Sequence, residues 1–135
     1  MCLLEKPVQS KLFVCSQEQF GSRTDMDRAK MFYESVFKRT LIEIPAPEAG
    51  MSMMIFASDP QGSGASGALI KHPMRQPTTE GALVYFSCQD CAVECALTAQ
   101  NGGKVFKDKF NIGANGFIAI IGDSEGNAIG LHSFQ

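Results

Sequence analysis

Ile120-Ile-Gly-Asp-Ser-Glu-Gly126 is followed at once by Asn127-Ala-Ile-Gly-Leu-His132, and this pattern carries most of the information about the fold. An earlier stretch copies it imperfectly, since Ile55-Phe-Ala-Ser-Asp-Pro-Gln-Gly62 leads into Ser66-Gly-Ala-Leu-Ile-Lys-His72. Each copy reads as an apolar strand, a turn containing Asp and Gly, and a second strand that ends in histidine. An internal repeat predicts a domain of two similar units, and the groove between them is where we look for function.

The residues around the two copies repeat one order of elements. In the first half, a helix is expected after Thr24 because apolar residues from Ala29 to Phe37 follow helical spacing. Strands are expected at 41–44, 51–57 and 67–71. In the second half, a strand is expected at 82–88, a helix capped by Asp90, and strands at 104–107, 117–122 and 128–134. The inner face of the second helix is predicted to be Val93, Ala96 and Leu97. The sequence therefore predicts an α+β fold.

Composition and charge restrict the class of protein. The chain has 135 residues, of which 44% are hydrophobic and 19% charged, as expected for one domain with a core. A net charge of −2 gives no basic field for nucleic acid, and no apolar run approaches the roughly 20 residues of a membrane span. The first residues do not resemble a secretory signal. Five cysteines, an odd number, favour reduced thiols in the cytoplasm. We expect no nucleic-acid or membrane partner.

We expect the whole chain, 1–135, to be a single domain with an internal division. Residues 23–72 are predicted to form the first module and residues 82–135 the second. Residues 73–81, which hold two prolines and a closing glycine, are expected to link them. Residues 1–22 are a divergent segment before the first module, although 11–15 are compatible with a short strand.

The predicted first helix, Asp25–Phe37, resembles the helix signature of the vicinal oxygen chelate superfamily, which includes glyoxalase I, bleomycin-resistance proteins and extradiol dioxygenases. Gly67-Ala-Leu-Ile, Asn101-Gly-Gly-Lys-Val and Gly122-Asp-Ser-Glu-Gly-Asn follow in the order expected of that family. The resemblance covers residues 23–135. It implies two βαβββ modules whose sheets form a shared cleft, a small-molecule ligand or substrate, and a homodimer.

The resemblance also implies where a metal would be held, because His, Gln or Glu ligands in metal-using members come from the first and last strand of each module. Three of the four matching positions hold Gly130, Ile70, and either Leu83 or Val84. The fourth falls near Glu18 or Gln19. A divalent ion needs three or more converging donors, so we expect no cofactor. The alternative is a lyase, isomerase or dioxygenase-type enzyme with an atypical Zn, Ni, Fe or Mn site, for which Glu18 and His132 are weak candidates.

The expected function is therefore the binding of a small, largely apolar metabolite by shape, as bleomycin-resistance proteins do by sequestration. A module whose cleft is filled by its own side chains is a third possibility. Tyr85 is a strand aromatic with a polar tip, and His72 and His132 occupy matching places in the repeat. The predicted ligand-binding residues are Tyr85, His72, His132, Ile70, Gly130 and Phe117.

Two further groups of residues have simpler explanations. The spacing of Cys88, Cys91 and Cys95 suggests half of a zinc site, but the second half is missing, so partly buried or dimer-contact thiols are expected. Asp123 and Glu125 are predicted to serve the tight turn in which they lie.

Overall fold

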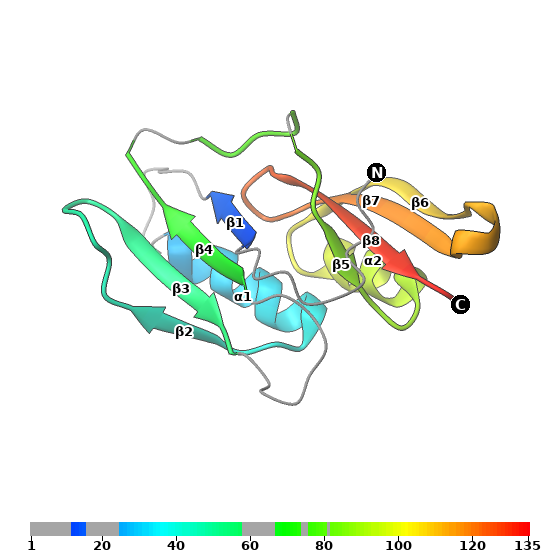
Figure 1. Cartoon of the computed structure of the whole chain (residues 1–135), viewed down its shortest axis with the longest axis horizontal. Coiled ribbons are helices and arrows are strands. Elements are labelled where there is room, and N and C mark those ends of the chain that lie inside the picture. Colours follow the sequence, from blue (N-terminus) through cyan, green and yellow to red (C-terminus); the bar gives the residue numbers. More distant parts are fainter. Residues whose placement is uncertain (1–11, 16–24, 58–66, 74–75, 81) are drawn as a thin grey trace.

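A computed structural model of the chain describes residues 12–15, 25–57, 67–73, 76–80 and 82–135 (Figure 1). Its elements in chain order are β1 (Leu12–Cys15), α1 (Asp25–Phe37), β2 (Leu41–Ile44), β3 (Ser52–Phe56), β4 (Gly67–Lys71), β5 (Tyr85–Ser87), α2 (Cys91–Gln100), β6 (Lys104–Asn111), the 3-10 turn η1 (Gly113–Asn115), β7 (Phe117–Gly122) and β8 (Ala128–Ser133). Among the described residues, no helix is long and apolar enough to cross a membrane.

The strands form two four-stranded sheets of the same topology. The order is β1-β4-β3-β2 in the first sheet and β5-β8-β7-β6 in the second. In each sheet the first strand pairs in parallel with the last, and the remaining strands are antiparallel. The structure is thus α+β with two sheets and two helices, as the sequence predicts.

Strand β1 belongs to the segment that the sequence leaves outside the first module. It pairs with β4 so that Cys15 lies beside Ile70, just as Tyr85 of β5 lies beside Gly130 of β8. The two parallel pairs are therefore equivalent in register. Strand β5 is shorter than the predicted run 82–88, and β6 is longer than the predicted run 104–107.

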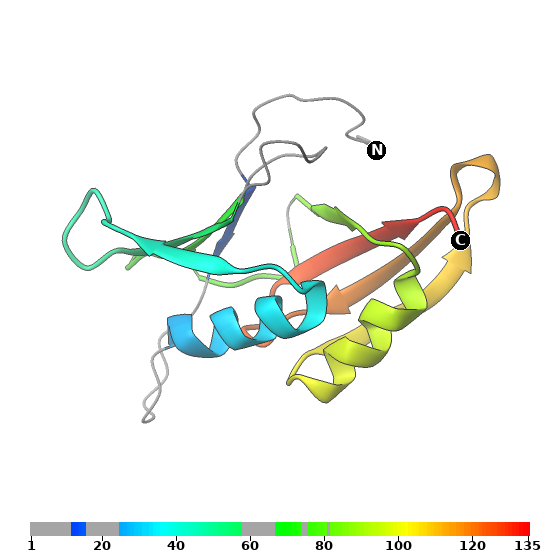
Figure 2. The same ribbon diagram turned by 90° about the horizontal axis from the view of Figure 1, so that it is seen from below.

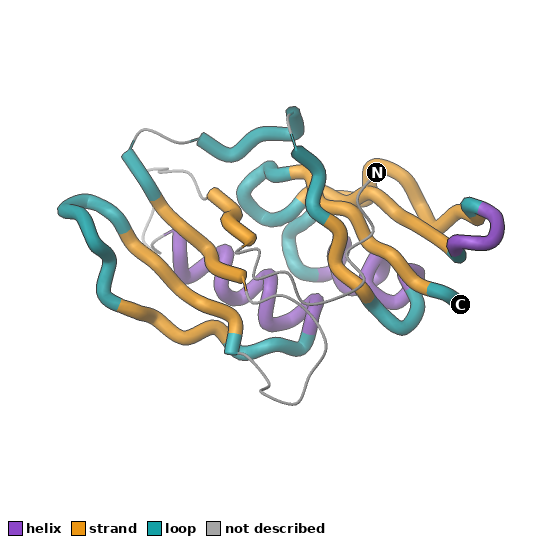
Figure 3. The backbone as a smooth tube through the Cα atoms, in the orientation of Figure 1, coloured by secondary structure: helices purple, strands orange, loops and turns teal. Residues whose placement is uncertain are grey.

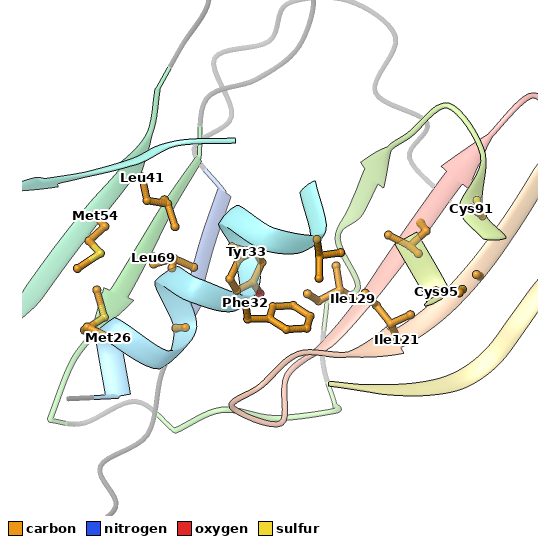
Figure 4. Packing of buried hydrophobic residues seen from close by; sticks show 14 residues of the cluster. Met26, Phe32, Tyr33, Leu41, Met54, Leu69, Cys91, Cys95, Ile121 and Ile129 are labelled. Atoms are coloured by element: carbon orange, nitrogen blue, oxygen red, sulfur yellow. The ribbon is translucent and has the colours of Figure 1, made fainter. Parts of the chain in front are cut away.

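Both helices lie on the same side of the two sheets (Figure 2). The buried residues of α1, which include Phe32, Tyr33 and Val36, belong to one core cluster with residues from both halves of the chain (Figure 4). The Phe37 ring stacks on Phe86 of β5 with centroids 4.3 Å apart. An aromatic pair adds about 0.5–1.5 kcal/mol to stability beyond the burial of its surface area. This contact therefore helps α1 to hold the first half of the chain against the second.

Helix α2 buries a different face from the one predicted. Its buried residues are Cys91, Cys95 and Thr98, whereas Val93 is 53% exposed. Leu97 packs partly against the core. The inner face predicted from Val93 and Ala96 was therefore wrong, because free cysteines and a threonine bury as readily as small apolar residues when their polar groups are satisfied. The predicted cap is present, since Asp90 accepts a hydrogen bond from the Ala92 N–H.

Candidate functional site

The candidate site lies on the face of the second sheet that turns away from the helices. Side chains alternate along a strand, and Phe86 and Leu131 pack into the core. Tyr85, Gly130 and His132 therefore share the opposite, helix-free face. In this register Tyr85 lies beside Gly130, and Ser87 beside His132. The structure thus brings three of the predicted site residues onto one surface of neighbouring strands.

The ring of Tyr85 covers Gly130. A Cβ atom added at Gly130 would overlap the Cδ1, Cε1 and Cγ atoms of that ring. Any residue larger than glycine would therefore displace the tyrosine. Tyr85 itself is only partly buried, so part of its surface is exposed.

These positions do not fit a divalent ion. Gly130 offers no donor and no room for one, and Ile70, at the matching position of the first sheet, is apolar and 9% exposed. The register also places Tyr85, rather than Leu83 or Val84, next to Gly130. Across the described part of the chain, no group of three or more His, Cys, Asp or Glu side chains is arranged to hold a metal. Glu18 and Gln19 lie outside the described residues.

His132 is a buried residue whose ring contacts two neighbouring residues. Its Nε2 atom lies 2.7 Å from the carbonyl oxygen of Asn115, and its ring meets Phe134 edge-on with centroids 4.9 Å apart. A carbonyl oxygen only accepts, so Nε2 carries the proton and does not bind a metal in this arrangement. His132 therefore acts here as a fixed donor that joins β8 to η1.

His72 lies in a different setting, just after β4 in the first sheet. Its Nε2 atom is 3.7 Å from Oε2 of Glu48, and the histidine is partly buried. The two histidines that match in the repeat thus belong to different sheets and have different partners.

Phe117 lies on the helix side of the second sheet, and not on the face of Tyr85. It pairs with Ser133, whose hydroxyl contacts Cys91 of α2. The Nζ atom of Lys109 lies 4.5 Å above the Phe117 ring. The structure therefore separates Phe117 from the other predicted ligand-binding residues of this sheet.

The first sheet contributes a hollow near the ends of β2 and β3. Met53 pairs with Ile70 in the ladder between β3 and β4, so both side chains share the face away from α1. A shallow depression of about 370 Å³ opens at the end of this sheet and includes Met51 and Met53 among its lining residues. A second hollow of about 370 Å³ lies between α2 and β6, on the helix side. Flexible methionine side chains suit a binding surface that adapts to its ligand.

Figures 1 and 3 show the turn that joins β7 to β8. This turn does more than reverse the chain, because its acidic side chains contact α1. The Tyr33 hydroxyl donates to Oδ2 of Asp123 at 2.8 Å. Arg28 donates from two nitrogens to the carboxylate of Glu125, at 2.8 and 2.6 Å. Sequence reasoning assigned both acids to turn chemistry alone. The available signal was a tyrosine within the apolar stripe of α1, whose hydroxyl needs a partner when buried.

Burial sets the protonation of this turn network. It raises the pKa of Tyr33 well above its ordinary value, and the neighbouring Asp123 carboxylate adds to that effect. Burial also raises the pKa of Asp123, although hydrogen bonds from Asn127, Tyr33 and Glu125 oppose the shift. The hydroxyl is therefore a firm donor, and it stabilises a carboxylate that has little access to water.

Comparison with known proteins identifies the fold. No protein-family model matches the sequence, and no curated protein matches it. Among solved structures, glyoxalase I from Zea mays superposes with a TM-score of 0.66 at 16% identity, over 92% of this chain and 45% of that one. An antibiotic binding protein from a Streptomyces species gives 0.64 at 24% identity, over 98% of both chains. A glyoxalase/bleomycin resistance protein from Albidiferax ferrireducens gives 0.63 at 20% identity, over 90% and 95%.

The chain therefore has the fold of the glyoxalase and bleomycin-resistance proteins, which confirms at the level of the fold the predicted resemblance to the vicinal oxygen chelate superfamily. It spans less than half the length of the maize glyoxalase I chain. It spans nearly the full length of the two bacterial proteins.

Proposed function

We propose that this protein binds a small, largely apolar molecule on the helix-free faces of its two sheets, in a cleft shared by two βαβββ modules, without a divalent ion. The observation that carries the proposal is the Tyr85 ring over Gly130. It places an aromatic surface where a metal-using relative would place a carboxylate ligand. Binding and sequestration need shape and apolar contact, and do not need an ion.

The described side chains suit such a ligand. Tyr85 supplies a flat ring and a hydroxyl, while Ile118 and Ile120 of β7 share its face and are partly buried. Burying apolar ligand surface contributes about 25 cal/mol per Å², so a molecule with several methylene or ring carbons gains most of its affinity here. The Streptomyces neighbour, an antibiotic binding protein, supports binding as a use of this fold at nearly identical length.

The proposal extends to the setting of the protein. We expect a cytoplasmic homodimer, in line with the resemblance and with the odd number of cysteines. Sedimentation velocity tests the dimer directly, because a single species with the mass of one chain would contradict it.

Thermal-shift screening tests the binding proposal. Protein treated with a chelator is screened against aromatic and aliphatic metabolites and aromatic antibiotics. We expect at least one compound to stabilise the protein, because a ligand at about 100 times its dissociation constant adds about 2.7 kcal/mol to the free energy of unfolding. If no compound shifts the melting temperature, a module with a filled cleft explains the structure better.

The site of binding is tested with a pair of variants. Tyr85→Ala removes the aromatic surface and should weaken binding of a screened compound by roughly ten- to a hundredfold, the equivalent of about 1.4–2.7 kcal/mol. Val93→Ala, on the exposed side of α2, is the matched control and should leave the affinity unchanged. Equal effects of the two substitutions would place the ligand elsewhere.

A further inference from the structure

Two cysteine thiols lie next to each other where β5 ends and α2 begins. The Sγ atoms of Cys88 and Cys91 are 3.7 Å apart, and both cysteines are free. A disulfide bond has an S–S length of about 2.05 Å, so the sulfurs need to approach by only about 1.7 Å. The Cys-x-x-Cys spacing and the position between a strand and a helix also match the setting of redox-active pairs in cytosolic proteins.

The surroundings of the pair tolerate the loss of both thiol hydrogens. The Cys88 thiol donates to the carbonyl oxygen of His132 at 3.4 Å, but that oxygen also accepts from the backbone N–H of Cys88 at 2.9 Å. The Cys91 thiol lies 3.7 Å from the carbonyl oxygen of Phe117, at a length that makes only a weak bond. Oxidation therefore leaves the His132 carbonyl satisfied, and the bond that the Ser133 hydroxyl donates to the Cys91 sulfur at 3.1 Å needs no thiol hydrogen.

We propose that Cys88 and Cys91 form a reversible intramolecular disulfide, with hydrogen peroxide or a small-molecule disulfide as the oxidant. With peroxide, the Cys88 thiolate attacks one oxygen, the O–O bond breaks, and water leaves after proton transfer, which yields a sulfenic acid. The Cys91 sulfur then attacks the Cys88 sulfur. The S–S bond forms as the S–O bond breaks, and a second water leaves with the Cys91 proton.

The exposure of the two thiols assigns their roles. Cys88 is partly exposed and Cys91 is fully buried, so the oxidant meets Cys88 first and Cys91 resolves the product. Burial, together with the adjacent Cys91 and Glu94, raises the pKa of the Cys88 thiol. Thiolate is therefore scarce, so the pair reacts more slowly than an exposed cysteine and responds to sustained oxidation.

Mass spectrometry of the full chain tests this inference. Folded protein is treated with hydrogen peroxide, alkylated, and digested without reduction. We expect the main product to have lost two hydrogen atoms, to contain a linked Cys88–Cys91 peptide, and to return to the starting mass with dithiothreitol. Oxidised glutathione should give the same linked peptide.

Matched variants identify the pair. Cys88→Ser should abolish the linked product, whereas Cys95→Ala, which removes the third cysteine of this cluster, should still form it. The wild-type peptide map remains decisive even if a variant folds poorly. The inference is overturned if the main product is a Cys88 sulfinic acid, or if the dominant disulfide joins any other two cysteines.

Discussion

At Asp123, four donors converge on a single buried carboxylate. The Glu125 and Asn127 backbone N–H groups donate to Oδ1, and the Tyr33 hydroxyl and the Asn127 amide donate to Oδ2, all at 2.8–2.9 Å. Because Tyr33 comes from α1 and the other donors come from the turn after β7, this carboxylate connects elements that are far apart in the sequence. Its environment gives two predictions.

Removing the Tyr33 hydroxyl should destabilise the fold. Tyr33→Phe keeps the ring contacts and deletes one hydrogen bond to a buried charged group, which we expect to lower the free energy of unfolding by about 1.5–3 kcal/mol in urea denaturation. Tyr85→Phe is the control, because no described residue bonds its hydroxyl, and it should change stability by less than about 0.5 kcal/mol. Similar losses in both variants would contradict the role given to Asp123.

The raised pKa of Asp123 predicts a pH dependence of stability. The native state binds this proton more readily than the unfolded state, so the contribution of Asp123 is fully present below its ordinary pKa of 3.8 and is lost as the pH rises through the higher native value. Relative to Asp123→Asn, which does not titrate, the wild type should lose free energy of unfolding as the pH rises above about 4. Urea denaturation of both proteins across this range measures the difference. The substitution itself adds an offset that does not change with pH, so a difference that stays constant or grows with pH would show that the pKa is not raised.

Gly130 and Tyr85 should depend on each other. Gly130→Ala forces a Cβ into the Tyr85 ring, and overpacking of this kind costs about 1–3 kcal/mol. In a Tyr85→Ala background the same substitution should cost much less, because the ring is absent. A double-mutant cycle by urea denaturation measures this coupling, and additive effects would mean that the ring does not occupy the space above Gly130.

At the scale of the elements, Gly103 is where both helices and the second sheet meet. A Cβ there would lie 2.6 Å from Cγ2 of Thr98 in α2 and 2.7 Å from Cε2 of Phe32 in α1, and it would press on the carbonyl of Gly122 in β7. The backbone carbonyl of Gly122 cannot move aside as a surface side chain can. A single methyl group at this position therefore disturbs three elements.

We expect Gly103→Ala to lower the free energy of unfolding by about 3 kcal/mol, at the upper end of overpacking. Gly102→Ala provides the comparison. Gly102 has φ of +87° and nothing within 4 Å of an added Cβ, so its substitution reports backbone strain alone, about 1 kcal/mol. If thermal or urea unfolding ranks the two substitutions in the opposite order, the close packing at Gly103 is wrong.

The helices and strands differ in how well they could be predicted from the sequence. The repeated strand–turn–strand patterns locate β3, β4, β7 and β8, because an apolar run bounded by Gly and Asp is a local signal. The buried face of α2 was missed, since its cysteines and Thr98 make hydrogen bonds that hydropathy does not encode. For example, the Thr98 hydroxyl donates to the carbonyl of Glu94 at 2.7 Å, which removes the cost of burying it.

The candidate site could be predicted only in part from the sequence. Strand alternation correctly places Gly130 and His132 on one face, but the partner of Gly130 depends on the register between β5 and β8. That register makes Tyr85 the neighbour of Gly130. Phe117 fell on the other face because an apolar strand in a two-layer fold does not reveal which side the helix covers.

At the scale of the whole molecule, the two halves share a single core and present their helix-free faces on the same side (Figures 2 and 4). The Tyr33 ring contacts the rings of Phe37, Phe56 and Phe86, so it touches both halves of the chain. A shared core fixes the two sheets relative to each other. The binding surface that we propose across both sheets would then be preorganised before the ligand arrives, which reduces the entropy lost on binding.

Calorimetric titration before and after exhaustive chelation shows whether this surface binds an apolar molecule without an ion. A compound selected by thermal shift is titrated into untreated protein, into chelated protein, and into chelated protein resupplied with Zn, Ni, Fe or Mn. We expect the same dissociation constant in all three samples and a loss of affinity in Tyr85→Ala. Binding that disappears on chelation and returns with one of the metals would contradict it.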